Sequence, residues 1–86
     1  MGLLQKYNVN IAMIEGINVG LEQYGGVYRV QTVSIDWNTQ SNKLDEISYN
    51  INNDLANQGN LKTECEMEDF LIGELGLTSA DLINFV

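Results

Sequence analysis

The sequence predicts an α+β fold, in which a small antiparallel β-meander of two or three strands packs against two or three α-helices in the C-terminal half. β-Branched and aromatic residues run through residues 27–37, a Gly-Gly pair comes just before them, and apolar residues after position 42 follow helical spacing. A chain of 86 residues can bury one modest core. We therefore expect residues 1–86 to form a single domain, β-rich over 1–40 and helical and acidic over 41–86.

The clearest local prediction is a β-hairpin around Gly25-Gly26, which can take the positive φ values of a two-residue type I′ turn. Folding the chain about this turn places Glu22 opposite Arg29 and Leu21 opposite Val30. An opposite-charge pair then meets on one face of the ribbon, and an aliphatic pair meets on the other. The local pattern therefore predicts both the turn and the register of the strands.

The strand after this turn changes phase along its length. Val33 and Ile35 share one face by a period of two, whereas Tyr28 and Val30 have the other parity. Such a change requires one extra residue in the strand, so we expect a β-bulge near residues 31–32.

Residues 9–24, upstream of the hairpin, are compatible with two structures. Their apolar residues alternate, which predicts a third strand with a turn at Glu15-Gly16. The same stretch also has apolar residues at roughly heptad spacing, which would form a helix containing Gly16 and Gly20. Each glycine inside a helix costs about 1 kcal/mol relative to alanine, and we therefore favour the strand.

The second half of the chain has helical periodicity. From Asn42 to Gly59 the apolar residues recur at i, i+3, i+7 and i+11. Ser41 or Asn42 can cap the start of this helix, and Gly59 suits the position after its end. A last short helix is expected over residues 79–85, with Thr78 or Ser79 as its cap. The apolar stripe of the long helix consists of Leu44, Ile47, Ile51 and Leu55.

A further helix is predicted to start at Thr63, because Thr63 and Glu66 have the spacing of a capping box. At 100° per residue, Glu66, Asp69 and Gly73 lie on the outer side of this helix, and Glu64 stacks on Glu68 at the border. Carboxylates in a first helical turn are favoured by the helix dipole. The buried arc of the helix would be Met67, Phe70, Leu71 and Leu75.

Charge excludes several classes of function. The net charge is −8, from 12 acidic and 4 basic residues, and residues 63–86 contain six of the acids and no base. Direct binding to nucleic acid is disfavoured, because it requires Lys and Arg side chains to displace counterions from phosphates. The sequence has no histidine and Cys65 is its only cysteine, so the usual general base and the commonest metal ligands are missing. We expect no catalytic activity, no metal site and no cofactor.

These observations favour a small non-catalytic module that binds a protein with a basic surface. That surface can be one that otherwise binds nucleic acid, in which case the module is an inhibitor that mimics nucleic acid, as phage-encoded counter-defence proteins do. Exposed aromatic side chains often anchor such interfaces. The predicted partner-binding residues are Glu64, Glu66, Glu68, Asp69, Glu74, Tyr49 and Trp37.

A second hypothesis is a structural or assembly subunit that self-associates, for example as a homodimer. The contact would be an edge strand or the apolar tail of residues 82–86, LINFV. Residues 1–8 lack the apolar core of a signal peptide, and no apolar run is long enough to cross a membrane. A single cysteine also fits a reducing compartment, and we therefore expect a cytoplasmic protein.

Overall fold

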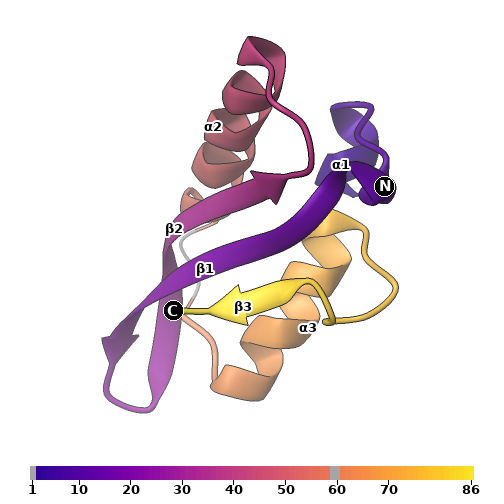
Figure 1. Cartoon of the computed structure of the whole chain (residues 1–86). Coiled ribbons are helices and arrows are strands. Elements are labelled where there is room, and N and C mark those ends of the chain that lie inside the picture. The colour runs from indigo at the N-terminus through magenta and orange to yellow at the C-terminus, as the bar shows by residue number, and fades with distance from the viewer. Residues whose placement is uncertain (1, 59–60) are drawn as a thin grey trace.

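The computed structural model describes residues 2–58 and 61–86 and shows an α+β architecture of two layers (Figure 1). A three-stranded sheet of order β2-β1-β3 forms one layer. In Figure 1, α3 passes behind the sheet and α2 stands beyond β2. Within the described residues the elements are α1 (Leu3–Lys6), the 3₁₀ helix η1 (Ile11–Met13), β1 (Ile14–Tyr24), β2 (Val27–Trp37), α2 (Asn42–Ala56), α3 (Glu64–Leu75) and β3 (Ile83–Phe85).

The register of the hairpin is confirmed. Leu21 pairs with Val30 and Glu22 pairs with Arg29, whose Nε lies 3.6 Å from the Glu22 carboxylate. The turn itself differs from the prediction, because only Gly25 has a positive φ, of +66°. A positive φ at the first central residue alone is the pattern of a type II′ turn. Both turn types match the right-handed twist of the strands, so the register is the same.

The β-bulge is confirmed at the predicted place. Gly20 pairs with Thr32 and Leu21 pairs with Val30, which leaves Gln31 as the extra residue of β2. The shift keeps Val30 and Val33 buried on the same side of the sheet, although three positions separate them.

The strand favoured for residues 9–24 is confirmed from Ile14 onward and is wrong before that point. Residues 11–13 form η1, where the side chain of Asn10 accepts a hydrogen bond from the Ala12 amide at 2.9 Å. The expected turn at Glu15-Gly16 is also wrong. The register only shifts there, since Ile14 pairs with Trp37 and Gly16 with Asp36, and β1 continues through it.

Two parts of the predicted architecture are wrong. The sheet is mixed, because β1 pairs antiparallel with β2 but parallel with β3, where Ile17 lies opposite Ile83. The helices are not confined to the C-terminal half, because α1 lies at residues 3–6. The expected helix over residues 79–85 is replaced by a turn and β3, and Ser79 closes the turn by accepting the Asp81 amide at 3.4 Å. A helix of seven residues gains few internal hydrogen bonds, whereas β3 completes the open edge of β1.

The core lies between the sheet and the helices. The predicted stripe of α2 (Leu44, Ile47, Ile51 and Leu55) is buried in full. On α3 the prediction is confirmed for Met67, Leu71 and Leu75, whereas Phe70 is only half-buried. Ser41 caps α2 by accepting the Lys43 amide at 3.2 Å. The cap predicted at Gly59 lies outside the described residues.

Candidate partner-binding surface

The first turn of α3 is fixed by the capping box that the sequence predicts. The backbone amide and the hydroxyl of Thr63 both donate to one carboxylate oxygen of Glu66, at 3.1 and 2.7 Å. These hydrogen bonds, with that of the side chain the stronger, lower the pKa of Glu66 below its ordinary value of 4.5. Because its carboxylate accepts these hydrogen bonds, Glu66 stabilises the helix start and has less capacity than its neighbours to bind a partner.

The acidic face of α3, which we define as Glu64, Glu66, Glu68 and Asp69, is exposed along the first two turns. Among the described residues the two ion pairs lie elsewhere, between Lys6 and Asp54 and between Arg29 and Glu22. The nearest base in the sequence, Lys62, places its ammonium over the ring of Phe70, 4.9 Å from the centroid. The acidic face therefore forms no ion pair within the described residues. Glu74, the fifth predicted acid, is half-buried and lies two turns further along α3.

The acidic face has two flanks that point in different directions. At 100° per residue, Glu66 lies beside Phe70 around α3, and Glu64 and Glu68 lie on the other side. Asp69 points outward, midway between Phe70 and Glu68. The Phe70 side points toward β2, because Phe70 contacts Lys62 and the backbone of Lys62 pairs with Tyr28 of β2. The flank of Glu64 and Glu68 therefore points away from Phe70 and its contact with Lys62. In Figure 1, α3 passes behind β3.

The two predicted aromatic anchors do not join the acidic face. Tyr49 is 62% exposed on the outer side of α2, as the helical wheel predicts. Trp37 is half-buried at the end of β2, and its indole Nε1 donates to the hydroxyl of Ser48 in α2 at 2.8 Å. In Figure 1, α2 and α3 lie at opposite ends of the sheet layer. The predicted residues thus form two separate groups, with the acids on α3 and the aromatics at α2.

Sequence reasoning named the apolar tail of residues 82–86 as a possible contact but expected a helix over residues 79–85, and so missed that the tail forms the edge strand β3. The Ile17 amide donates to the Leu82 carbonyl at 2.8 Å, and the Val86 amide donates to the Val19 carbonyl at 3.0 Å. Because backbone groups alternate in direction along a strand, the amide of Phe85 then faces away from β1. It has no acceptor among the described residues. The side chains of Phe85 and Val86 are 40% and 83% exposed, so β3 offers an open edge with apolar side chains. The sequence carries little signal for this strand, because only three residues form it.

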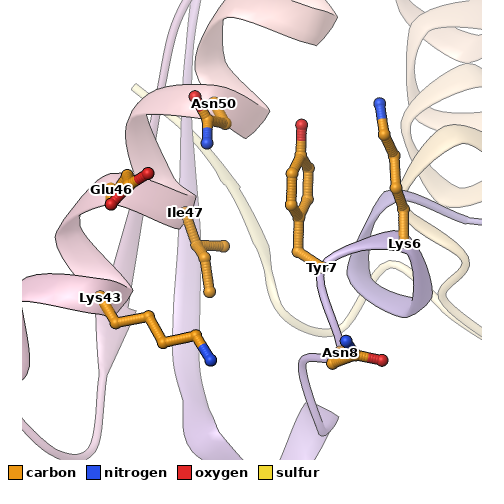
Figure 2. A pocket seen from close by; sticks show the side chains of 7 residues that line it. All are labelled: Lys6, Tyr7, Asn8, Lys43, Glu46, Ile47 and Asn50. Atoms are coloured by element: carbon orange, nitrogen blue, oxygen red, sulfur yellow. The ribbon is translucent and has the colours of Figure 1, made fainter.

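An open cleft of about 380 Å³ was also missed, because its residues come from segments far apart in the sequence. Figure 2 shows the ring of Tyr7 standing between Lys6 and the α2 side chains, with the Lys43 ammonium pointing toward Asn8. Tyr7 donates its hydroxyl to Asp54 at 2.7 Å, and this hydrogen bond to a carboxylate raises the pKa of Tyr7. The lining residues are Lys6, Tyr7, Asn8, Lys43, Glu46, Ile47 and Asn50.

The cleft and the acidic face are opposite in character. Two of the four bases of the chain line the cleft, and one of them, Lys6, already pairs with Asp54 at 3.6 Å. Glu46 adds a carboxylate to the lining, so the cleft has mixed charge. The acidic face instead carries charge of a single sign, and it is therefore the surface with a defined electrostatic preference.

None of the helices in residues 2–58 and 61–86 has the length and apolar character needed to cross a membrane. The same residues contain no group of three or more His, Cys, Asp or Glu side chains placed to hold a metal ion. The chain matches no protein-family model, no curated protein and no solved structure.

Proposed function

We propose that this protein is a non-catalytic binding module whose acidic face docks on a basic surface of a partner protein. The observation that carries the proposal is the acidic face itself: Glu64, Glu68 and Asp69 are exposed, and no Lys or Arg in the described residues pairs with them. A partner that supplies Lys or Arg side chains would relieve the repulsion between these carboxylates.

Helix capping does not account for all of these acids. The dipole of a helix favours carboxylates in its first turn, which explains Glu64 and Glu66. Glu68 and Asp69 lie in the second turn, where the effect of the dipole falls off. Solubility requires net charge but does not require that six of the 12 acids lie in the last 24 residues with no base. This uneven distribution supports a surface that selects its partner by charge.

The basic surface of the partner can be one that otherwise binds nucleic acid. Such surfaces carry clustered Lys and Arg side chains that contact successive phosphates. Carboxylates on neighbouring helical turns present negative charge in a comparable row. On this proposal the module acts as an inhibitor, because its acidic face occupies the positions that phosphates would take. Phage-encoded counter-defence proteins are the class that this mechanism resembles.

The test compares two charge-reversal variants with equal changes in net charge. Glu68→Lys/Asp69→Lys alters the acidic face and leaves the capping residue Glu66 in place, and Asp45→Lys/Glu46→Lys alters the start of α2. Each protein is used to capture binding proteins at low and at high salt, since screening weakens exposed charge contacts. We expect the natural protein and the α2 variant to capture the same protein at low salt, and the α3 variant to lose it. Capture that resists salt, or that both variants lose equally, would contradict the proposal.

A second candidate is an assembly subunit, and the open edge of β3 with exposed Phe85 and Val86 favours it. Two edges of this kind can pair and continue the sheet from one copy to the next. The expected observation is a dimer that grows with concentration in light scattering. A strict monomer at high concentration and high salt, where repulsion between copies is screened, would exclude this candidate.

A further inference from the structure

We infer that the partner of this module binds as an extended basic segment, which adds a fourth strand to the sheet along the outer edge of β3. The inference rests on the proposed function and specifies how the partner is held. Three observations carry it: the unpaired outward amide of Phe85 in β3, the negative charge of the chain, and the cover over the opposite edge of the sheet.

The first observation is the free backbone of β3. Residues 82, 84 and 86 use their ladder groups toward β1, as the bonds from Ile17 to Leu82 and from Val86 to Val19 show. The amide of Phe85 points to the other side and finds no acceptor in the described residues. An extended segment running alongside β3 would accept this hydrogen bond. Main-chain hydrogen bonds of this kind supply affinity when a peptide extends a sheet.

The second observation is charge. The chain carries a net charge of −8, and Glu64, Glu68 and Asp69 are exposed without an ion pair in the described residues. A segment of opposite charge is attracted to such a chain, whereas an acidic segment is repelled. The charge therefore favours a segment rich in Lys or Arg.

The third observation is that the opposite edge is already occupied. The Tyr28 amide of β2 donates to the Lys62 carbonyl at 2.7 Å, and the Val33 amide donates to the side-chain oxygen of Asn52 at 2.6 Å. A segment that extends the sheet would have to break these bonds at β2. At β3 the outward amide of Ile83 donates to the Ala80 carbonyl at 3.0 Å, and the amide of Phe85 can be bonded without breaking any hydrogen bond in the described residues.

A second copy of the chain is a poor occupant of the β3 edge. Each copy carries a net charge of −8, so pairing β3 with β3 would bring two negatively charged chains together. Like charges held close together oppose association, most strongly at low salt. The edge therefore excludes copies of its own chain and favours a segment rich in Lys or Arg.

The experiment uses two labelled peptides of equal charge, one alternating Lys and Thr and the other alternating Lys and Pro. The Lys-Thr peptide can form a strand, whereas proline removes every second backbone donor and disfavours the ladder. Affinity is measured by fluorescence anisotropy at low salt, and protection of the Phe85 amide is measured by hydrogen exchange. We expect the Lys-Thr peptide to bind more tightly and to slow exchange at Phe85.

Three variants assign the contacts. Phe85→Pro removes the outward amide, Phe85→Thr is its matched control because it keeps the amide, and Glu64→Gln/Glu68→Gln removes the charge of the flank. We expect Phe85→Pro to bind the Lys-Thr peptide about fivefold or more weakly than Phe85→Thr, because a lost backbone hydrogen bond has an effect of about this size. The glutamine variant should weaken both peptides, since both depend on charge.

The outcomes separate the inference from the proposed function. If the glutamine variant weakens binding while the two peptides bind equally and Phe85→Pro matches Phe85→Thr, the strand-addition inference fails and the acidic-face proposal stands. If the glutamine variant and added salt change nothing, the acidic-face proposal fails. Protection of Phe85 that rises with protein concentration alone would make a second copy the occupant and overturn the inference. The peptide comparison on the natural protein decides the matter even if Phe85→Pro does not fold.

Discussion

The two edges of the sheet differ in whether their outward backbone amides are hydrogen-bonded. At β2, the backbone of Lys62 pairs with Tyr28 in both directions, at 2.7 and 2.9 Å, and Asn52 of α2 accepts the Val33 amide. At β3, the outward amide of Phe85 donates to no acceptor in the described residues, and the side chains of Phe85 and Val86 are exposed. An open edge strand is a template for pairing with any other chain. The fold removes that template on one side of the sheet and leaves it on the other.

This difference shows that charge can protect an edge strand whose backbone no other segment covers. Proteins commonly protect an edge by keeping it short or by placing charges on it. β3 has only three residues, and the chain carries a net charge of −8. This negative charge repels acidic chains, including other copies, but attracts basic ones. The same carboxylates thus account for both solubility and selectivity, which the sequence alone could not separate.

The largest expected effect on stability comes from removing the hydrogen bond that covers the edge of β2. Asn52→Ala leaves the half-buried amide of Val33 without its acceptor, which typically costs about 1–3 kcal/mol in the free energy of unfolding. Asn53→Ala is the matched control, because Asn53 lies next in the same helix and its side chain makes no hydrogen bond in the described residues. Urea denaturation measures both. Equal losses of stability in the two variants would show that Asn52 does not cover the edge.

A smaller effect is expected at the start of α3. Thr63→Ala removes the hydroxyl of the capping box and should cost about 1 kcal/mol. Because the folded protein lowers the pKa of Glu66, its contribution is present above the ordinary value of 4.5 and is lost as pH falls through the lower folded value. Thr63→Ala should reduce this acid-side loss of stability. Denaturation series on both proteins from neutral pH down to below pH 4.5 test the prediction, and identical slopes would contradict it.

Neutralising the flank of the acidic face should change stability only slightly. In Glu64→Gln/Glu68→Gln, losing the i, i+4 repulsion gains about 0.2–0.5 kcal/mol. Losing the Glu64 charge from the first turn costs about 0.3–1 kcal/mol of dipole stabilisation, so the two effects largely cancel. The informative change is in association, because the variant removes part of the charge that keeps copies apart. Light scattering at low salt should show more self-association than for Asp45→Asn/Glu46→Gln, which loses the same charge on α2. Equal self-association of the two variants would show that the position of the lost charge, on α3 or on α2, has no influence.

The smallest effect on stability is expected at the open edge. Phe85→Pro removes an amide that bonds to nothing in the described residues, and substitutions of this kind usually stay within about 0.5 kcal/mol. Thermal unfolding beside Phe85→Thr measures the change. A loss as large as that of Asn52→Ala would show that the Phe85 amide has a structural partner, and the contrast between the two edges would disappear.

The sequence predicts the parts of this fold that local patterns determine. The Glu22–Arg29 and Leu21–Val30 pairs set the register of the hairpin, and the parity change before Val33 sets the bulge. Helical spacing predicts the buried faces of α2 and α3 because one stripe of each helix packs on the sheet. Such patterns depend on neighbours within a few positions, so they can be found without knowledge of the tertiary structure.

The remaining features depend on contacts between distant segments. Three residues, Ile83–Phe85, carry little intrinsic preference, and they become a strand only because β1 offers them a free edge. The cleft between Tyr7 and α2 and the cover of Val33 by Asn52 arise in the same way. Of the predicted site, the acids of the first two turns of α3 lie together, whereas Trp37 packs on Ser48 and belongs with α2. A helical wheel shows which face of a helix is buried, but it does not show which other element that face contacts.

The most direct test of the account is amide hydrogen exchange at Val33 and Phe85, measured in the free protein and with the Lys-Thr peptide. We predict slow exchange at Val33 in both states, fast exchange at Phe85 in the free monomer, and slow exchange at Phe85 once the peptide is bound. A Phe85 amide that is already protected in the free monomer, or that still exchanges fast when the peptide is bound, would contradict the claim that β3 is the edge this protein keeps open for a basic partner.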